Sequence, residues 1–203
     1  MDIRLIKAED LEQLLKKNKF PKYRSKQIEN WARKTDIKSF NQMSNLPNDL
    51  IDFLIENFKL NKSKVKTSKK SSDGTIKFAI QLYDNLIVEA VLIPSNKRIT
   101  ACVSSQVGCS LDCNFCATSK IKKMRNLESY EIFDQIMLLN KESINHFSSP
   151  ITNIVFMGMG EPLLNYKNVI ESIDQITSDF GIGISYKKIT LSTSGISKMI
   201  RKM

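Results

Sequence analysis

Strand-like and helix-like segments alternate through the second half of the chain, and this order restricts the possible fold more than any other feature. Strand patterns cover residues 99–103, 151–157 and 188–192, and helix patterns cover residues 129–143 and 166–178. A strand, a helix and a further strand in this order favour parallel pairing through right-handed crossovers. Three strands cannot close a barrel. The class is therefore α/β, and residues 98–203 predict the first, incomplete part of a (β/α) barrel.

The first part of the chain predicts a different organisation. Residues 1–60 form a small helical domain, because apolar residues recur at helical spacing over residues 8–15, 25–34 and 48–57. Residues 61–72 read as a basic, Ser-rich connector. Residues 75–82 and 86–93 alternate as the two strands of a hairpin, with a turn at Asp84 and Asn85. The expected divisions are thus a helical domain (1–60), a basic linker with a hairpin (61–97) and the partial barrel (98–203).

Each of the three predicted parallel strands leads into a motif of residues that could bind a ligand or take part in a reaction. The first precedes a cysteine run at residues 109–116, the second precedes GMGEP at 158–162, and the third ends in STSG at 192–195. Active sites of such barrels lie at the carboxyl ends of the strands. We therefore expect the three motifs to meet at one site.

Cys109, Cys113 and Cys116 have the spacing C-x3-C-x2-C. A structural zinc ion takes four protein ligands, whereas a cubane iron–sulfur cluster held by three thiolates keeps one iron open for a small molecule. A zinc site would need Cys102 or His146 as the fourth ligand. Cys102 lies seven residues upstream of Cys109, outside the usual spacing. The spacing favours a cluster, with zinc as the alternative.

The chain has a surplus of basic residues, 31 Lys and Arg against 21 Asp and Glu, with a net charge of +10. Such a surplus fits a nucleic acid as partner, but it also fits a solvated, Lys-rich surface, and charge leaves both open. No apolar run approaches the roughly 20 residues that span a bilayer, and the N-terminus lacks a secretory apolar region. We therefore expect a cytoplasmic protein, in which the four cysteines serve a metal or catalysis rather than disulfides.

Five segments resemble one known family. The run CVSSQVGCSLDCNFCATSKIKKMRNL (102–127) resembles the RlmN/Cfr family of radical SAM RNA methyltransferases, where SAM is S-adenosylmethionine. Phe115, just before the last cysteine, also fits the radical SAM signature. Four further segments match that family: YRSKQIENW (23–31), VEAVLIP (88–94), FMGMGEPLLN (156–165) and ITLSTSG (189–195). The resemblance covers nearly the whole chain, and GMGEPL together with LIP favours the RlmN branch.

The resemblance implies a role for each candidate residue. Cys109, Cys113 and Cys116 would hold a 4Fe–4S cluster, and Gly158, Gly160, Glu161 and Ser192 would bind SAM. Cys102 would help to release a covalent enzyme–RNA adduct, and Glu89 would accept a proton.

Several of these residues have an ordinary structural explanation when the resemblance is set aside. Glu89 alternates with Val88 and Ala90, as a solvent-facing strand residue does. Ser192 fits a turn or the N-cap of a helix, and Cys102 fits a strand residue packed as a small hydrophobe. For these three positions the functional reading depends on the resemblance.

The resemblance also implies a reaction. The family methylates C2 of an adenosine in 23S rRNA, and for some members in tRNA next to the anticodon. Because C2 is not nucleophilic, a radical route through SAM and the cluster replaces polar transfer. Such a reaction needs a low-potential electron donor such as flavodoxin or ferredoxin, and we expect a monomer. The alternatives are C8 methylation of the Cfr type and a non-catalytic RNA-binding module that uses the helical domain and the hairpin.

One departure from the family concerns the second catalytic cysteine. In the family this residue carries the methyl group and lies near the C-terminus, but the sequence has no cysteine after Cys116. We therefore expect residues 1–203 to be part of a longer enzyme and to be unable to complete the reaction alone.

Overall fold

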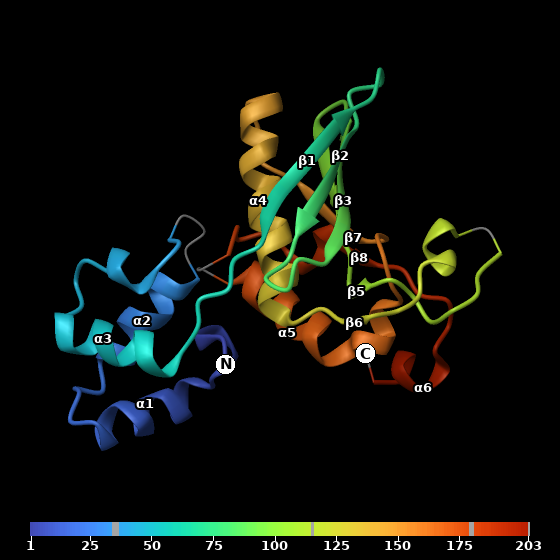
Figure 1. Cartoon of the computed structure of the whole chain (residues 1–203). Coiled ribbons are helices and arrows are strands. Elements are labelled where there is room, and N and C mark those ends of the chain that lie inside the picture. Colours follow the sequence, from blue (N-terminus) through green and yellow to red (C-terminus); the bar gives the residue numbers. More distant parts are fainter. Residues whose placement is uncertain (34–36, 115, 179–180, 203) are drawn as a thin grey trace. The chain divides into compact units, whose positions relative to one another are not determined.

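The computed structural model describes residues 1–33, 37–114, 116–178 and 181–202, and Phe115 lies outside them. The chain divides into two compact units, Met1–Lys62 and Ser63–Met203 (Figure 1). The first unit is helical, and the second contains the sheet and all four cysteines.

The described residues of the N-terminal unit form three α-helices, α1 (Ala8–Lys17), α2 (Arg24–Ala32) and α3 (Asn48–Asn57), and two 3₁₀ turns at Ile3–Leu5 and Phe40–Gln42. The predicted apolar faces form its core, in which Leu15, Ile28 and Leu54 are fully buried. Burial of these side chains stabilises a helix that would be marginal on its own at this length. The helices expected in this part of the chain are confirmed.

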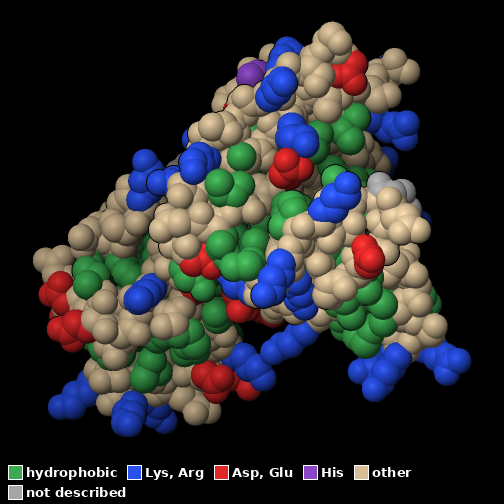
Figure 2. Space-filling view, turned by 45° about the vertical axis from the view of Figure 1, so that its right-hand side comes forward, with side chains coloured by type: hydrophobic (Ala, Val, Ile, Leu, Met, Phe, Trp, Pro, Cys, Tyr) green, Lys and Arg blue, Asp and Glu red, His purple; other side chains and the backbone are tan. Residues whose placement is uncertain are grey.

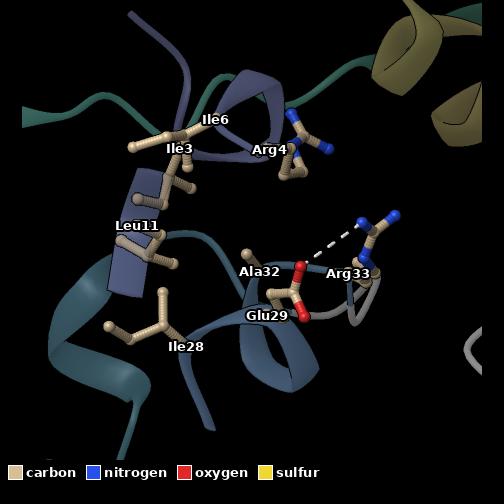
Figure 3. A pocket seen from close by; sticks show the side chains of 8 residues that line it. All are labelled: Ile3, Arg4, Ile6, Leu11, Ile28, Glu29, Ala32 and Arg33. Atoms are coloured by element: carbon tan, nitrogen blue, oxygen red, sulfur yellow. Dashed lines mark ion pairs between the residues drawn. The ribbon is translucent and has the colours of Figure 1, made fainter. Parts of the chain in front are cut away.

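A small cavity lies inside this helical unit, between Ile3, Leu11 and Ile28, with the ion pair of Glu29 and Arg33 at its side (Figure 3). Its volume is about 10 Å³. A cavity of this size holds about one water molecule. We therefore do not regard it as a ligand site.

The second unit is built on one six-stranded sheet with the order β1-β2-β3-β4-β7-β8. The strands are β1 (Lys64–Lys70), β2 (Ile76–Gln81), β3 (Ile87–Ser95), β4 (Arg98–Cys102), β7 (Asn153–Phe156) and β8 (Ile189–Leu191). The first four strands pair antiparallel, whereas β4, β7 and β8 pair parallel. Helix α4 (Ser129–Phe147) connects β4 to β7, and α5 (Tyr166–Thr177) connects β7 to β8. The predicted α/β class and its parallel strands are confirmed.

Strand β1 corrects one expectation, because residues 61–72 were expected to form a connector. Val65 is the only apolar residue of β1, and it pairs with Ile80 of β2. The other residues are Lys, Thr and Ser with exposed side chains, so no alternating apolar pattern indicated a strand. Lysines are common on such edge strands, where they oppose pairing with another chain.

Helices α4 and α5 cover one face of the sheet, and α4 runs beside β1–β3 in Figure 1. Alternate residues of the strands point to this covered face; among them Phe78, Val88 and Ala101 are buried in one cluster with Phe133 and Ile136 of α4. The remaining strand residues lie on the opposite face, which we call the open face. Because strand side chains alternate, the burial pattern assigns each residue to one face.

A short two-stranded ladder, β5 (Gln106–Val107) with β6 (Arg125–Asn126), encloses the cysteine loop at residues 108–124. The sequence did not predict this ladder. The remaining elements are 3₁₀ turns at Ala117–Lys120, Pro162–Asn165 and Tyr186–Lys188 and the short helix α6 (Ser197–Ile200). Among the described helices, none has the length and apolar character to cross a membrane.

Candidate functional site

The three motifs that follow the parallel strands line one pocket of about 300 Å³. Its walls come from the cysteine loop after β4, the loop after β7 and the loop after β8. Among the lining residues are Cys109, Cys113, Cys116, Gly158, Gly160, Glu161, Ser192, Thr193 and Ser194. The structure thus brings together seven of the nine predicted site residues.

Backbone hydrogen bonds fix the ends of the cysteine loop. The N–H of Cys109 donates to Ile121 O at 3.2 Å, and the N–H of Met124 donates to Val107 O at 2.8 Å. The three thiols are half-buried, and the N–H of Leu111 donates to the Sγ of Cys109 at 3.4 Å. Hydrogen bonds to cysteine sulfurs are one means by which proteins tune iron–sulfur clusters. The loop therefore presents three half-buried thiols to the pocket, and the sulfur of Cys109 accepts a backbone hydrogen bond.

The two residues proposed as a fourth zinc ligand lie elsewhere. Cys102 belongs to β4 and does not line the pocket. His146 belongs to the last turn of α4, where its Nε2 lies 3.6 Å from an oxygen of Glu142. Helix α4 ends at Phe147, whereas the sequence predicted a helix over residues 129–143. Because α4 leads into the start of β7, His146 lies at the opposite end of β7 from the cysteine loop.

The donor set fits a cluster better than a single zinc ion. Within the described ranges, no three His, Cys, Asp or Glu side chains converge as ligands of one metal ion. A cubane cluster requires less convergence, because each thiolate binds a different iron. Three soft thiol ligands, with no fourth ligand converging on them among the described residues, suit such a cluster.

Glu161 connects two walls of the pocket and is only 5% exposed. Its Oε1 accepts a hydrogen bond from Leu163 N–H at 3.0 Å, and its Oε2 accepts one from Ser194 N–H at 2.7 Å. Burial favours the neutral acid, but these hydrogen bonds favour the anion more strongly and lower the pKa of Glu161. The side chain is therefore a carboxylate at neutral pH.

Gly158 and Gly160 are required by close contacts inside the protein. A Cβ on Gly160 would lie 2.4 Å from the Cβ of Gln106, and φ of Gly160 is +92°. A Cβ on Gly158 would lie 2.7 Å from Val103 O. These contacts show that the loop after β7 needs both glycines to pack against the segment after β4.

The segment Ser104 to Gln106 supports the loop after β7, and the sequence did not predict this role. The Oγ of Ser104 accepts a hydrogen bond from Met159 N–H at 2.9 Å, and Oε1 of Gln106 accepts one from Glu161 N–H at 2.9 Å. Asn165 donates from Nδ2 to Ser105 O and Leu127 O at 2.8 and 2.7 Å. The available signal was a polar Ser-Ser-Gln run directly after a strand, where barrels place functional loops.

Ser192 is exposed at the pocket and caps no described helix, since the residue at the N-cap of α6 is Ile196. The helix-cap explanation of Ser192 is therefore wrong. Its position at the end of β8 leaves the hydroxyl available to a ligand in the pocket.

Cys102 and Glu89 lie on the open face, outside the pocket lining. Cys102 pairs with Val91 and Val155, is 9% exposed, and burial raises the pKa of its thiol. The carboxylate of Glu89 is half exposed and lies 3.1 Å from Lys77 Nζ. The backbone O of Glu89 accepts a 2.6 Å hydrogen bond from Ser104 Oγ, so Glu89 is fixed to the segment that supports the pocket.

Comparisons with known proteins show which proteins the chain resembles along its length. Residues 103–203 match the family model of the radical SAM superfamily. A probable dual-specificity RNA methyltransferase RlmN of Flavobacterium psychrophilum is 54% identical over 202 residues, which are 100% of this chain and 58% of that protein. This chain belongs to the RlmN/Cfr family of radical SAM proteins. The resemblance found in the motifs is thereby confirmed.

Two further relatives show how much of their own length the chain covers. A probable dual-specificity RNA methyltransferase RlmN of Cytophaga hutchinsonii is 49% identical over 201 residues, 99% of this chain and 55% of that protein. A crystal structure of a radical SAM methyltransferase from Sphaerobacter thermophilus superposes with a TM-score of 0.83 at 32% identity, covering 100% of this chain and 59% of that one. The chain thus spans somewhat more than half the length of these relatives.

Proposed function

We propose that this chain provides the cluster-binding and SAM-binding part of a radical SAM RNA methyltransferase. The observation that carries the proposal is the single pocket lined by three cysteines together with the GMGEP and STSG loops. The names of the relatives support RNA as the substrate class. In finer detail, we propose C2 of an adenosine in 23S rRNA as the target, with tRNA next to the anticodon as a second substrate.

In this proposal, Cys109, Cys113 and Cys116 would hold three irons of a 4Fe–4S cluster. When bound, the cluster supplies the single electron that cleaves SAM and so permits methylation of a carbon that is not nucleophilic. A low-potential flavodoxin or ferredoxin in the cytoplasm would supply that electron.

Gly158, Gly160, Glu161 and Ser192 would contact SAM. Glu161 already accepts two backbone hydrogen bonds, and a carboxylate has about four acceptor positions. The hydroxyls of Thr193 and Ser194 also interact with this carboxylate, so the ammonium group of SAM would take the place of one of them while Glu161 holds the two loops in place.

On the open face, Glu89 would accept a proton and the thiol of Cys102 would help to release the enzyme–RNA adduct. Replacing an aromatic hydrogen by a methyl group releases a proton, and the carboxylate of Glu89 would accept it. Cys102, whose pKa is raised by burial, remains a thiol at neutral pH. Its proposed role in releasing the enzyme–RNA adduct would therefore require that a base first remove its proton.

The test uses a polypeptide extended to the length of the relatives, with RNA digested and analysed by mass spectrometry. We expect 2-methyladenosine; 8-methyladenosine would assign the C8 reaction instead, and unmodified RNA would leave a binding module. E89Q should reduce methylation by at least about 100-fold, the usual contribution of a general base, whereas E56Q, at an exposed glutamate of α3, should not. Residues 1–203 alone, which have no cysteine after Cys116, should not turn over.

A further inference from the structure

Strands β1 and β2 carry exposed lysines on the open face. The side chains of Ile76, Phe78 and Ile80 point to the covered face, so Lys77 points to the open face. In the register of β1 with β2, Lys69 pairs with Lys77 and Lys64 pairs with Gln81. Lys64, Lys69 and Lys77 therefore share the open face, and we call these three residues the basic strip.

Two residues of the basic strip, Lys69 and Lys77, lie on one cross-strand row with Cys102. Lys69 pairs with Lys77, Lys77 with Val91, and Val91 with Cys102. Neighbouring strands lie about 4.8 Å apart, so the Cα atoms of Lys77 and Cys102 are separated by about 10 Å. The long side chains of Lys69 and Lys77 thus flank the open face beside Cys102 and Glu89.

Protection of a sheet edge explains only part of the basic strip. Lysines on an edge strand oppose aggregation, and this accounts for Lys64 and Lys69 of β1. It does not account for Lys77, because β2 lies inside the sheet, between β1 and β3; the carboxylate of Glu89 is the ion-pair partner of Lys77, at 3.1 Å. The only acidic residue from Ser63 to Lys77 is Asp73, and its carboxylate accepts hydrogen bonds from the N–H and Oγ of Thr75.

We propose that the basic strip binds the phosphate backbone of the RNA whose target base is held over Cys102. This inference rests on the proposed function and adds the surface that positions the substrate. Lysine and threonine side chains are typical phosphate contacts, and Thr67, paired with Ala79, lies on the same face. On the face of the molecule shown in Figure 2, Lys and Arg side chains are dispersed. The net charge therefore does not identify the basic strip; its position in the sheet relative to Cys102 does.

An acidic redox protein is the competing partner for a basic surface. Such a donor must approach the cysteine pocket, whose walls follow β4, β7 and β8. The basic strip lies on β1 and β2, at the opposite edge of the sheet. RNA reaching over Cys102 would cross the strip, and for this reason the geometry favours RNA.

The test measures binding of residues 1–203 to a fluorescein-labelled RNA hairpin with adenosine in its loop, by anisotropy at several KCl concentrations. Each lost phosphate contact to unpaired RNA reduces the slope of log K against log salt by about 0.7. We expect this reduction for K69A and for K77A, and about 1.4 for the double variant. The matched control is K70A, because Lys70 is an exposed residue of the same strand but pairs with Ile76 and lies on the covered face.

The outcomes of this experiment distinguish failure of the basic strip as the RNA-binding surface from failure of the proposed function. If the unaltered chain binds and K69A and K77A keep its slope, or if K70A reduces the slope equally, the basic strip is not the RNA surface while the proposed function stands. Slower reduction by flavodoxin with unchanged RNA binding would assign the strip to the electron donor and overturn the inference. No salt-dependent binding by the unaltered chain would contradict both the strip and RNA as the substrate class. K69A leaves the Lys77–Glu89 pair intact and so separates phosphate binding from any effect on Glu89.

Discussion

The backbone N–H of Ser194 donates a 2.7 Å hydrogen bond to Oε2 of Glu161, and this bond connects the loop after β8 to the loop after β7. The second oxygen of Glu161 is bonded to Leu163 N–H. One buried carboxylate therefore fixes two walls of the pocket before any ligand binds, and it does so from within the GMGEP motif. Its structural and ligand-binding roles can be separated experimentally.

Replacing the carboxylate of Glu161 by an amide should lower both stability and SAM affinity. A hydrogen bond to a charged group contributes about 1.5–3 kcal/mol, and E161Q keeps one acceptor oxygen while placing an NH₂ group against a backbone N–H. We expect a loss of about 2 kcal/mol in the free energy of unfolding, measured with urea. E56Q, at an exposed glutamate, is the control, and equal stability of the two variants would contradict the structural role.

The pH dependence of stability should report the same carboxylate. Burial raises the pKa of Glu161 in the folded chain, but its hydrogen bonds lower this pKa by more, so that it lies below the ordinary value of 4.5. The unfolded chain therefore binds this proton first as pH falls. The stabilisation is complete above about pH 4.5 and is lost as pH falls through the lowered pKa. The difference in thermal midpoint between the unaltered chain and E161Q should shrink below pH 4.5; a difference that stays constant down to pH 3 would refute this assignment.

Arg125 should be essential for the position of the cysteine loop. Its guanidinium makes two bonds to Glu131, at 2.7 and 2.8 Å, and one to Asp84 at 2.7 Å. Burial opposes its charge, but these partners raise the pKa of Arg125 further above its ordinary value. R125M leaves Glu131, with a 1% exposed side chain, as an unpaired buried charge, which costs about 3 kcal/mol. Arg98 is exposed, so R98M is the control.

The R125M effect can be assigned to the loop by limited proteolysis. Because β6 contains Arg125 and forms one end of the cysteine loop, cleavage within residues 108–124 should accelerate more than cleavage elsewhere. R125M/E131M should recover part of the lost stability, since it removes the buried charge. Proteolysis that accelerates uniformly would show a general loss of stability and no specific role in the loop.

The four cysteines should differ in reactivity in the metal-free, reduced chain. Cys102 is 9% exposed and its pKa is raised by burial, whereas the other three are half-buried at the pocket. Since the thiolate is the reactive form, iodoacetamide at pH 7.5 should label Cys102 last, as followed by peptide mass spectrometry. Labelling of Cys102 as fast as Cys113 would contradict its placement on β4.

The fold of the second unit was predictable where periodicity reflects burial. Parallel strands and their helices alternate clearly in the sequence, and the rule that strand ends carry the site brought three motifs together correctly. Strand β1 was not predictable, because its exposed lysines hide the pairing with β2. The β5–β6 ladder was not predictable either, since two-residue strands give no periodic signal.

The supporting residues of the site were less predictable than its motifs. Ser104 and Gln106 are fully buried and form hydrogen bonds to the loop after β7, but a polar run after a strand does not reveal its partners. For Gly160, the resemblance implied a SAM-binding role, but the sequence did not reveal the close contact with Gln106 that excludes a larger residue there. Such long-range contacts depend on the assembled fold.

We propose that Cys109, Cys113 and Cys116 together hold an iron–sulfur cluster in the pocket that they share with the GMGEP and STSG loops. The most direct test is the iron and acid-labile sulfide content of residues 1–203 after anaerobic reconstitution. We expect about four irons and four sulfides per chain, loss of both in C113A, and retention of both in C102A. One zinc per chain without sulfide, or loss of the cluster in C102A, would contradict the assignment of these three cysteines as cluster ligands.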